Sequence, residues 1–200
     1  MRTLSQATME TGTPSSPAAD GPSDALLLAG LREGDQAAFE SLFLRYREPI
    51  ARFLSRLLGD GDEAEDMVQE AFLRLHRHPL SAGHEQNVRA WLYRVAANLG
   101  YNALRGRQRR EKREAAAQSA ANVEVDPTDT AVAAEQRQEV RRALSGLSLR
   151  HQTCLLLRHQ GLSYAEIAQV VGVAASSVGT ILARAEADFK RHYTGKENPL

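Results

Sequence analysis

The segment Gly161–Tyr193, GLSYAEIAQVVGVAASSVGTILARAEADFKRHY, has the pattern of two short helices joined by a tight turn. Ser163 and Glu166 have the S-x-x-E spacing of a capping box, which predicts that a helix begins just after Ser163. Gly172 lies where the chain must turn, a position that favours a residue tolerant of positive φ. The pattern predicts a helix-turn-helix, whose second helix can enter a DNA major groove. Two packed helices of an ordinary bundle are the alternative.

The second helix of this pair is expected over about 175–191, with one apolar and one polar face. Hydrophobic side chains recur at helical spacing on the face that should pack inward: Val178, Leu182, Ala185 and Phe189. The opposite face carries the candidate DNA contacts, which are Ser176, Ser177, Thr180 and Arg184.

Charge is unevenly distributed along a chain whose formal net charge is zero. Residues 89–113 contain eight basic residues and one acid, a net charge of +7. Acids are concentrated in residues 60–70 and 114–135. This separation predicts one surface for a polyanion and another for a different partner.

The order of composition along the chain predicts an all-α protein of two small helical domains joined by a flexible linker. Residues 1–23 are rich in small and polar residues without apolar periodicity, which is typical of a disordered tail. Helical patterns fill residues 24–113 and 132–193. Residues 114–131 are predicted to be the linker because small and acidic residues and the Asp126-Pro127 pair interrupt the pattern. Residues 194–200 form a short tail.

Three helices are expected in the first domain, over Asp35–Leu58, Asp62–His78 and Val88–Arg107. The second begins with acids and ends with bases, which suits the helix dipole and needs no further explanation. The third has an apolar side and a polar side that carries Arg89, Arg94, Asn98, Tyr101, Asn102 and Arg105. Arginine, asparagine and tyrosine can hold phosphates and bases, although a solvated basic face is the alternative.

Other kinds of chemistry find no support in the sequence. The only cysteine, Cys154, lies in an apolar helical run and is expected to be a buried core thiol. His76 and His78 point apart on a helix, so we expect no metal site, and no phosphate-binding glycine motif occurs. No pocket of paired carboxylates is indicated, so we expect neither catalytic residues nor a cofactor. Without an apolar run of about 20 residues or a signal sequence, we expect a cytoplasmic protein that does not insert into membranes.

Three motifs occur together in the order of one known family. They are DEAEDMVQEAFLRL at 62–75, AWLYRVAANL at 90–99 and GLSYAEIA at 161–168. Over residues 25–193 the chain resembles bacterial sigma factors of the sigma-70 family, in the small extracytoplasmic-function (ECF) group. The resemblance implies region 2, a bundle of three to four helices, in residues 24–113, and region 4, the helix-turn-helix domain, in residues 132–193.

By this resemblance, the helix at 62–78 would dock on the clamp helices of the RNA polymerase β′ subunit, through Asp66, Gln69 and Glu70, with Phe72 in the core. The core polymerase, including its β subunit, and promoter DNA would be the partners. Residues 80–88 and the following helix would capture the melted minus-ten element. The DNA-binding residues implied for region 2 are Arg94, Asn98, Tyr101, Asn102, Arg105 and Arg107. The helix at 175–191 would recognise the minus-thirty-five element as duplex.

One departure from the family concerns this last helix. Family members often carry several basic residues there, whereas Arg184 is the only base of this helix before Lys190. Fewer phosphate contacts predict a shallower dependence of binding on salt. Gly179 also costs helix stability, on the order of 1 kcal/mol relative to alanine.

Two other hypotheses are weighed against the sigma factor. One is an autonomous helix-turn-helix regulator that binds duplex DNA without polymerase, and the other is an adaptor that contacts only proteins. The acidic helix followed by the helix of Trp91 argues against both, because neither requires that order. The resemblance also implies an anti-sigma factor as partner, around which the two domains would close by means of the linker.

Overall fold

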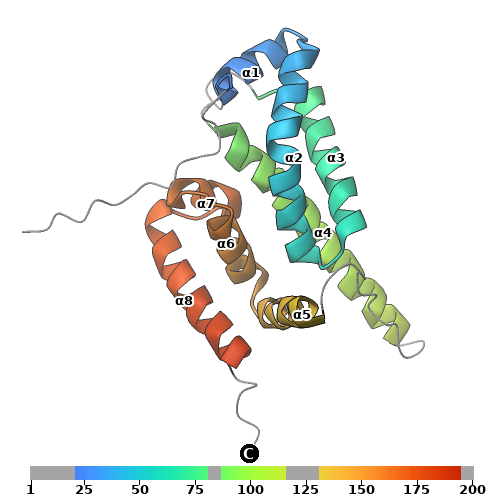
Figure 1. Ribbon diagram of the computed structural model, residues 1–200, viewed down its shortest axis with the longest axis vertical. Coiled ribbons are helices and arrows are strands. Elements are labelled where there is room, and N and C mark those ends of the chain that lie inside the picture. Colours follow the sequence, from blue (N-terminus) through green and yellow to red (C-terminus); the bar gives the residue numbers. More distant parts are fainter. Residues whose placement is uncertain (1–20, 81–86, 116–130, 195–200) are drawn as a thin grey trace, which may run out of the picture.

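The computed structural model describes residues 21–80, 87–115 and 131–194, which form eight helices and no strand. The predicted tails lie outside these ranges except at residues 21–23 and 194, as do most of the predicted linker and residues 81–86. The all-α prediction is confirmed, and two helical domains lie side by side (Figure 1).

The N-terminal domain contains four helices: α1 (Asp24–Arg32), α2 (Gln36–Leu58), α3 (Gly61–Arg77) and α4 (Val88–Ala115). Helix α1 is additional to the three helices expected from periodicity. It begins at the N-cap Ser23, and its Asp24 carboxylate accepts hydrogen bonds from Arg45 and from the Tyr46 hydroxyl of α2. These bonds hold the short helix against the long one.

Helices α2 and α3 pack along each other, and α4 crosses both (Figure 1). Helix α2 begins with Asp35 as N-cap and ends at Gly59, whose φ of 74° closes the helix in the left-handed region. Aromatic rings fill the contact between α2 and α3, with Phe43 and Phe72 edge to face at 4.9 Å between centroids. Phe72 is 1% exposed, as expected of a core residue.

The C-terminal domain contains α5 (Ala131–Ser145), α6 (Leu149–His159), α7 (Tyr164–Val171) and α8 (Ala175–Thr194). Helix α8 packs on α5, α6 and α7. His151 of α6 and Asp188 of α8 form a hydrogen bond of 3.0 Å that joins two of these helices. A hydrogen bond from Arg191, together with that from His151, lowers the pKa of the Asp188 carboxyl. Cys154 is fully buried, as expected.

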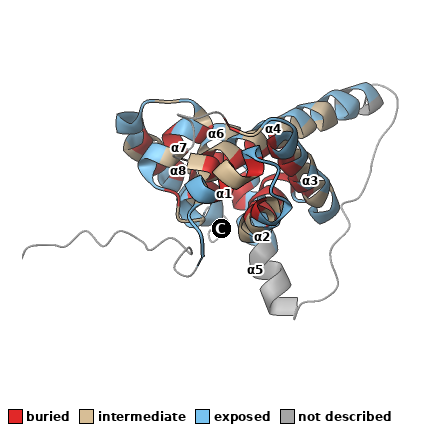
Figure 2. Ribbon diagram, turned by 90° about the horizontal axis from the view of Figure 1, so that it is seen from above, coloured by how far each residue is buried: buried red, intermediate tan, exposed pale blue. Residues whose placement is uncertain are grey.

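The two domains share one continuous hydrophobic core. Helix α7 packs against α4, and α6 packs against α2. Figure 2 shows buried residues running through the centre, while the C-terminal part of α4 projects away from it. No single described helix is long and apolar enough to span a membrane; α7 and α8 qualify only as a pair bent by 89°, and their apolar residues serve the core.

Candidate nucleic-acid interface

Helix α4 presents a line of polar and basic side chains to solvent. The predicted residues Arg94, Asn98, Asn102 and Arg105 are all exposed. Their spacing of four, four and three residues places them on one side of the helix. The helix points this side outward because Leu92 and Ala96 are buried in the core on the other side. We call these four residues the α4 stripe.

The helix continues beyond the predicted end at Arg107 to Ala115. This extension keeps Arg109, Arg110 and Arg113 in helical order, and all three are exposed. Arginine and lysine have high helix propensity, which explains why the dense charge does not end the helix. The basic segment therefore forms an elongated positive surface that a polyanion can neutralise.

Tyr101 does not point freely outward as expected. Its hydroxyl donates a hydrogen bond of 2.7 Å to Thr153 Oγ1 of α6, and burial raises the pKa of its phenol. Helical periodicity identifies a polar side of α4, but it cannot show that a second domain packs against part of that side.

Arg107 also has protein partners in this structure. Its guanidinium donates a 3.0 Å hydrogen bond to the Leu58 carbonyl oxygen and pairs with Asp60 and Glu63. The end of α2 leaves carbonyl oxygens without helical partners, and the start of α3 is acidic, so a cation between them is stabilised. Arg107 thus fastens α4 to the α2–α3 turn.

The helix-turn-helix has the local geometry that the sequence predicts. Ser163 and Glu166 form both bonds of the capping box, and Gly172 has a φ of 68° at the turn. The four predicted contact residues of α8 are exposed: Ser176, Ser177, Thr180 and Arg184. Apolar Val178, Leu182 and Ala185 are buried on the other side. The predicted face is therefore open to a ligand, and it carries one positive charge.

A second exposed face lies on α3. Asp66 and Gln69 are exposed, whereas Glu70 is half-buried and forms a 2.7 Å ion pair with Arg74 of the same helix. Leu73 follows on the same side, one turn further, and is 44% exposed. A single exposed leucine is common on protein surfaces, so Leu73 alone does not indicate an interface. Leu73 lies seven residues, or about two helical turns, after Asp66, so the sequence alone places both residues on the same side of the helix.

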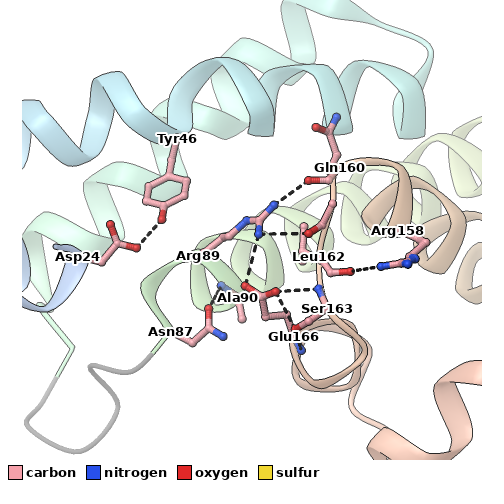
Figure 3. A network of polar contacts seen from close by, with 11 residues as sticks. Asp24, Tyr46, Asn87, Arg89, Ala90, Arg158, Gln160, Leu162, Ser163 and Glu166 are labelled. Carbon is pink, nitrogen blue, oxygen red and sulfur yellow. Dashed lines mark hydrogen bonds and ion pairs between the residues drawn. The ribbon is translucent and has the colours of Figure 1, made fainter. Parts of the chain in front are cut away.

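Arg89, like Tyr101 and Arg107, has a position that sequence patterns did not reveal. It was expected on the polar side of α4, but it reaches the turn between α6 and α7 and is largely buried there (Figure 3). Among the described residues, no cluster of histidine, cysteine and carboxylate side chains could hold a metal ion.

Comparisons with known proteins cover both domains. The family described as Sigma-70 region 2 matches residues 42–110, and the family described as Sigma-70, region 4 matches residues 137–188. The chain is 33% identical over 171 residues to the ECF RNA polymerase sigma-E factor of Escherichia coli (strain K12), covering 80% of this chain and 87% of that protein. It is 32% identical to the ECF RNA polymerase sigma factor SigM of Mycobacterium tuberculosis (strain ATCC 25618 / H37Rv), covering 84% of each chain.

Solved structures share the fold. CnrH in complex with the cytosolic domain of CnrY matches with a TM-score of 0.65 and 21% identity, over 84% of this chain and 94% of that one. The sigma factor RpoE in complex with the anti-sigma factor NepR from Bartonella quintana matches with a TM-score of 0.60 and 23% identity. This match covers 77% of this chain and 95% of that one.

Proposed function

This chain belongs to the sigma-70 family as one of its ECF sigma factors, and on that premise we propose how its helices divide the work of transcription initiation. A sigma factor directs core RNA polymerase to promoter DNA and is not itself an enzyme. The observation that carries the assignment is that both halves of the chain match this family and relatives align across them. Neither the autonomous regulator nor the adaptor accounts for that combination.

The exposed face of α3 binds the clamp helices of the β′ subunit. Asp66 and Gln69 supply polar contacts, and the exposed Leu73 beside them supplies an apolar one. Glu70 contributes after exchanging its pairing with Arg74 for a polymerase residue. The C-terminal domain then lies next to the β subunit.

The α4 stripe binds the non-template strand of the melted minus-ten element. Arg94 and Arg105 bind phosphates at the two ends of the stripe. Between them, Asn98 and Asn102 form hydrogen bonds with the exposed bases. Unstacking a base costs a few kcal/mol, so binding of the open strand must offset that cost. Tyr101 and Arg107 join this surface only if their present partners release them.

Helix α8 enters the major groove of the minus-thirty-five element. Its exposed Ser176, Ser177 and Thr180 are neutral hydrogen-bonding groups, and Arg184 is the single cation among the predicted contacts. Such a helix recognises duplex DNA mainly through hydrogen bonds in the groove, and contacts between cations and phosphates contribute little to the binding free energy. Upstream recognition by this sigma factor is accordingly less sensitive to salt than that of a basic helix.

An anti-sigma factor is a further partner of this chain, by analogy with the solved complex of the sigma factor RpoE with the anti-sigma factor NepR. The protein acts in the cytoplasm, because core polymerase and promoter DNA are found there.

Transcription with core polymerase from the source organism tests these assignments. Purified core enzyme is incubated with a library of promoter DNAs, with and without the chain, and the transcripts are sequenced. We expect transcripts that depend on the chain and share two short upstream motifs. D66K should reduce these transcripts at least tenfold by weakening core binding, whereas E33K, a matched reversal of the exposed acid that follows α1 as its C-cap, should not. Binding to promoter duplex without polymerase, together with no dependent transcripts, would favour the autonomous regulator.

A further inference from the structure

The C-terminal part of α4 extends beyond the body of the protein and carries exposed cations (Figure 2). Gly100 is the last buried residue of α4 among those whose burial is described. Arg107 then fastens the helix to the α2–α3 turn through the Leu58 carbonyl oxygen and the Glu63 carboxylate. Beyond this fastening, α4 carries three exposed arginines that we call the α4 arm: Arg109, Arg110 and Arg113.

The arginines of the α4 arm have no hydrogen-bond or ion-pair partner within the described part of the chain. Arg89 and Arg107 of the same helix, in contrast, bind carbonyl oxygens and carboxylates of the protein. Like charges four residues apart, such as Arg109 and Arg113, destabilise a helix. The helix dipole favours cations only in the last turn, so it accounts for Arg113 but not for the rest of the arm. A polyanionic ligand would offset the remaining repulsion.

The α4 arm continues the side of the helix on which the α4 stripe lies. Arg109 and Arg113 follow Arg105 by four and eight residues, which keeps all three on nearly the same side. Eight residues of α-helix rise about 12 Å. The same length of B-form DNA contains about three to four base pairs, at roughly 3.4 Å each. Arg110 is turned by about 100° from Arg109. The arm therefore presents cations in two directions, which suits phosphates that lie on both strands of a duplex.

The composition of the arm favours paired DNA over unpaired bases. Binding of a single strand depends on side chains that stack on exposed bases or form hydrogen bonds with them. The α4 stripe has such groups in Asn98 and Asn102, whereas residues 106–115 contain no asparagine and no aromatic residue, and Gln108 is their only amide. Arginines without such neighbours contact phosphates and contribute no direct base recognition.

We propose that the α4 arm binds the phosphates of the promoter duplex directly upstream of the minus-ten element. The chain passes from this end of α4 to the domain proposed to bind the minus-thirty-five element, so this end of α4 lies on the upstream side. The placement on a promoter rests on the function proposed above, whereas the preference for duplex DNA rests on the arm alone.

The arm also supplies an electrostatic contribution that α8 lacks. Arg184 is the single cation among the predicted contacts of α8, whereas the arm has three. Because phosphate contacts do not depend on base sequence, upstream binding relies more on the presence of a duplex than on the bases of the minus-thirty-five element.

The double variant R109Q/R113Q removes two charges of the arm and leaves the α4 stripe intact. Glutamine has a helix propensity close to that of arginine, so α4 should keep its length. R52Q/R56Q is the matched control, because Arg52 and Arg56 are also exposed, also four residues apart, and lie on α2 outside the arm and the stripe. Circular dichroism must show the same helix content in the parent and both variants.

Two fluorescent probes are titrated with the full chain. One is a single strand of 12 thymidines, and the other is a 15-base-pair duplex from which the same strand extends at the 3′ end. Two lost duplex contacts should reduce the affinity of R109Q/R113Q for the forked probe at least tenfold at about 0.1 M salt and make its salt slope shallower by about 1.8. The affinity for the single strand should change less than twofold, and R52Q/R56Q should leave both affinities unchanged.

Equal losses of affinity for the two probes would overturn the duplex assignment, because the arm would then extend the single-strand site. Unchanged affinity for both would overturn DNA binding by the arm and favour an acidic protein as its occupant.

R94Q/R105Q separates the arm from the proposed role of the α4 stripe, since it should weaken binding of both probes. If it changed neither affinity while R109Q/R113Q weakened only the forked probe, the role of the stripe would fail and that of the arm would stand. A parent chain that binds neither probe, with or without core polymerase, would overturn the inference, whereas the dependent transcripts described above decide the proposed function separately.

Discussion

At the scale of single residues, Tyr93 shows that burial alone does not make a side chain stabilising. It is 1% exposed and packs edge to face on Phe53, yet its hydroxyl has no hydrogen-bond partner among the described residues. A buried donor without a partner loses its hydration, which costs about 1–3 kcal/mol. Burial also raises the pKa of its phenol to about 12.

Y93F should therefore stabilise the protein by about 1 kcal/mol, because it removes the unpaired hydroxyl and keeps the ring. Y46F is the matched opposite, since the Tyr46 hydroxyl donates to the Asp24 carboxylate and its loss should destabilise by about 1–3 kcal/mol. Urea unfolding followed by circular dichroism measures both. Equal destabilisation by the two substitutions would contradict the difference in hydrogen bonding.

Cys154 gives the stability of the protein a dependence on alkaline pH. Burial raises the pKa of its thiol from 9.0 to about 11. Folding thus favours the protonated thiol, so this contribution is complete below pH 9 and is lost as pH rises through about 11. Between pH 8 and 10.5 the loss amounts to about 2 kcal/mol, at 1.36 kcal/mol per pKa unit.

This loss should be absent from C154A. The free energy of unfolding is measured for the parent and C154A at both pH values, and the difference between the two proteins should shrink by about 2 kcal/mol at the higher one. A difference that stays constant would mean that the thiol titrates alike in the folded and unfolded chains. Comparing the two proteins cancels the titration of tyrosines and lysines, which they share.

At the scale of elements, the helix-turn-helix contains two glycines with opposite roles. Gly172 has a φ of 68°, which costs an L-residue about 1–2 kcal/mol, although a Cβ there would meet nothing within 4 Å. Gly179 lies inside α8, and a Cβ there would meet the Tyr164 ring at 3.6 Å, an ordinary contact.

The same substitution at the two glycines should change stability in opposite directions. G179A should stabilise by up to about 1 kcal/mol through helix propensity, while G172A should destabilise by about 1–2 kcal/mol through backbone strain. Thermal and urea unfolding of the full chain measure both. If G179A lowered stability, a constraint on α8 other than propensity and available space would have to exist.

Elements differ in how far the sequence determines them. The capping box and the turn at Gly172 were predictable because their causes lie within a few residues. Helix α1 was not predicted separately, because its nine residues are too few for a periodic pattern and its anchor, Asp24, bonds to Tyr46 in α2. The α4 stripe followed from local spacing, whereas the orientation of Tyr101 depends on packing against a residue 52 positions away.

At the scale of the whole molecule, the net charge is zero although positive and negative side chains lie on different helices. The net charge is zero, yet the basic residues of α4 lie on one elongated helix, and the acids of α3 that are predicted to contact polymerase lie on another. The first face suits a polyanion and the second suits a protein with basic residues. The net charge alone could not have predicted these two faces, whereas the order of charged residues along the chain predicted both.

The α4 stripe should set the salt dependence of single-strand binding by the whole chain. Each phosphate contact on a single strand contributes about 0.7 to the slope of log affinity against log salt concentration. R94Q/R105Q should therefore make the slope shallower by about 1.4, since each arginine is an exposed end of the stripe. Titrations of the full chain with a fluorescent single-stranded DNA at several salt concentrations measure this slope.

R47Q is the control, because Arg47 is an exposed arginine of α2 outside the stripe. It should leave the slope almost unchanged, although it removes one positive charge from the protein. If R47Q lowered the slope as much per charge as R94Q/R105Q, the strand would be responding to the overall charge of the chain. A larger effect of the stripe would mean that the phosphates bind where α4 places its arginines, so that a neutral protein can bind DNA through one helix.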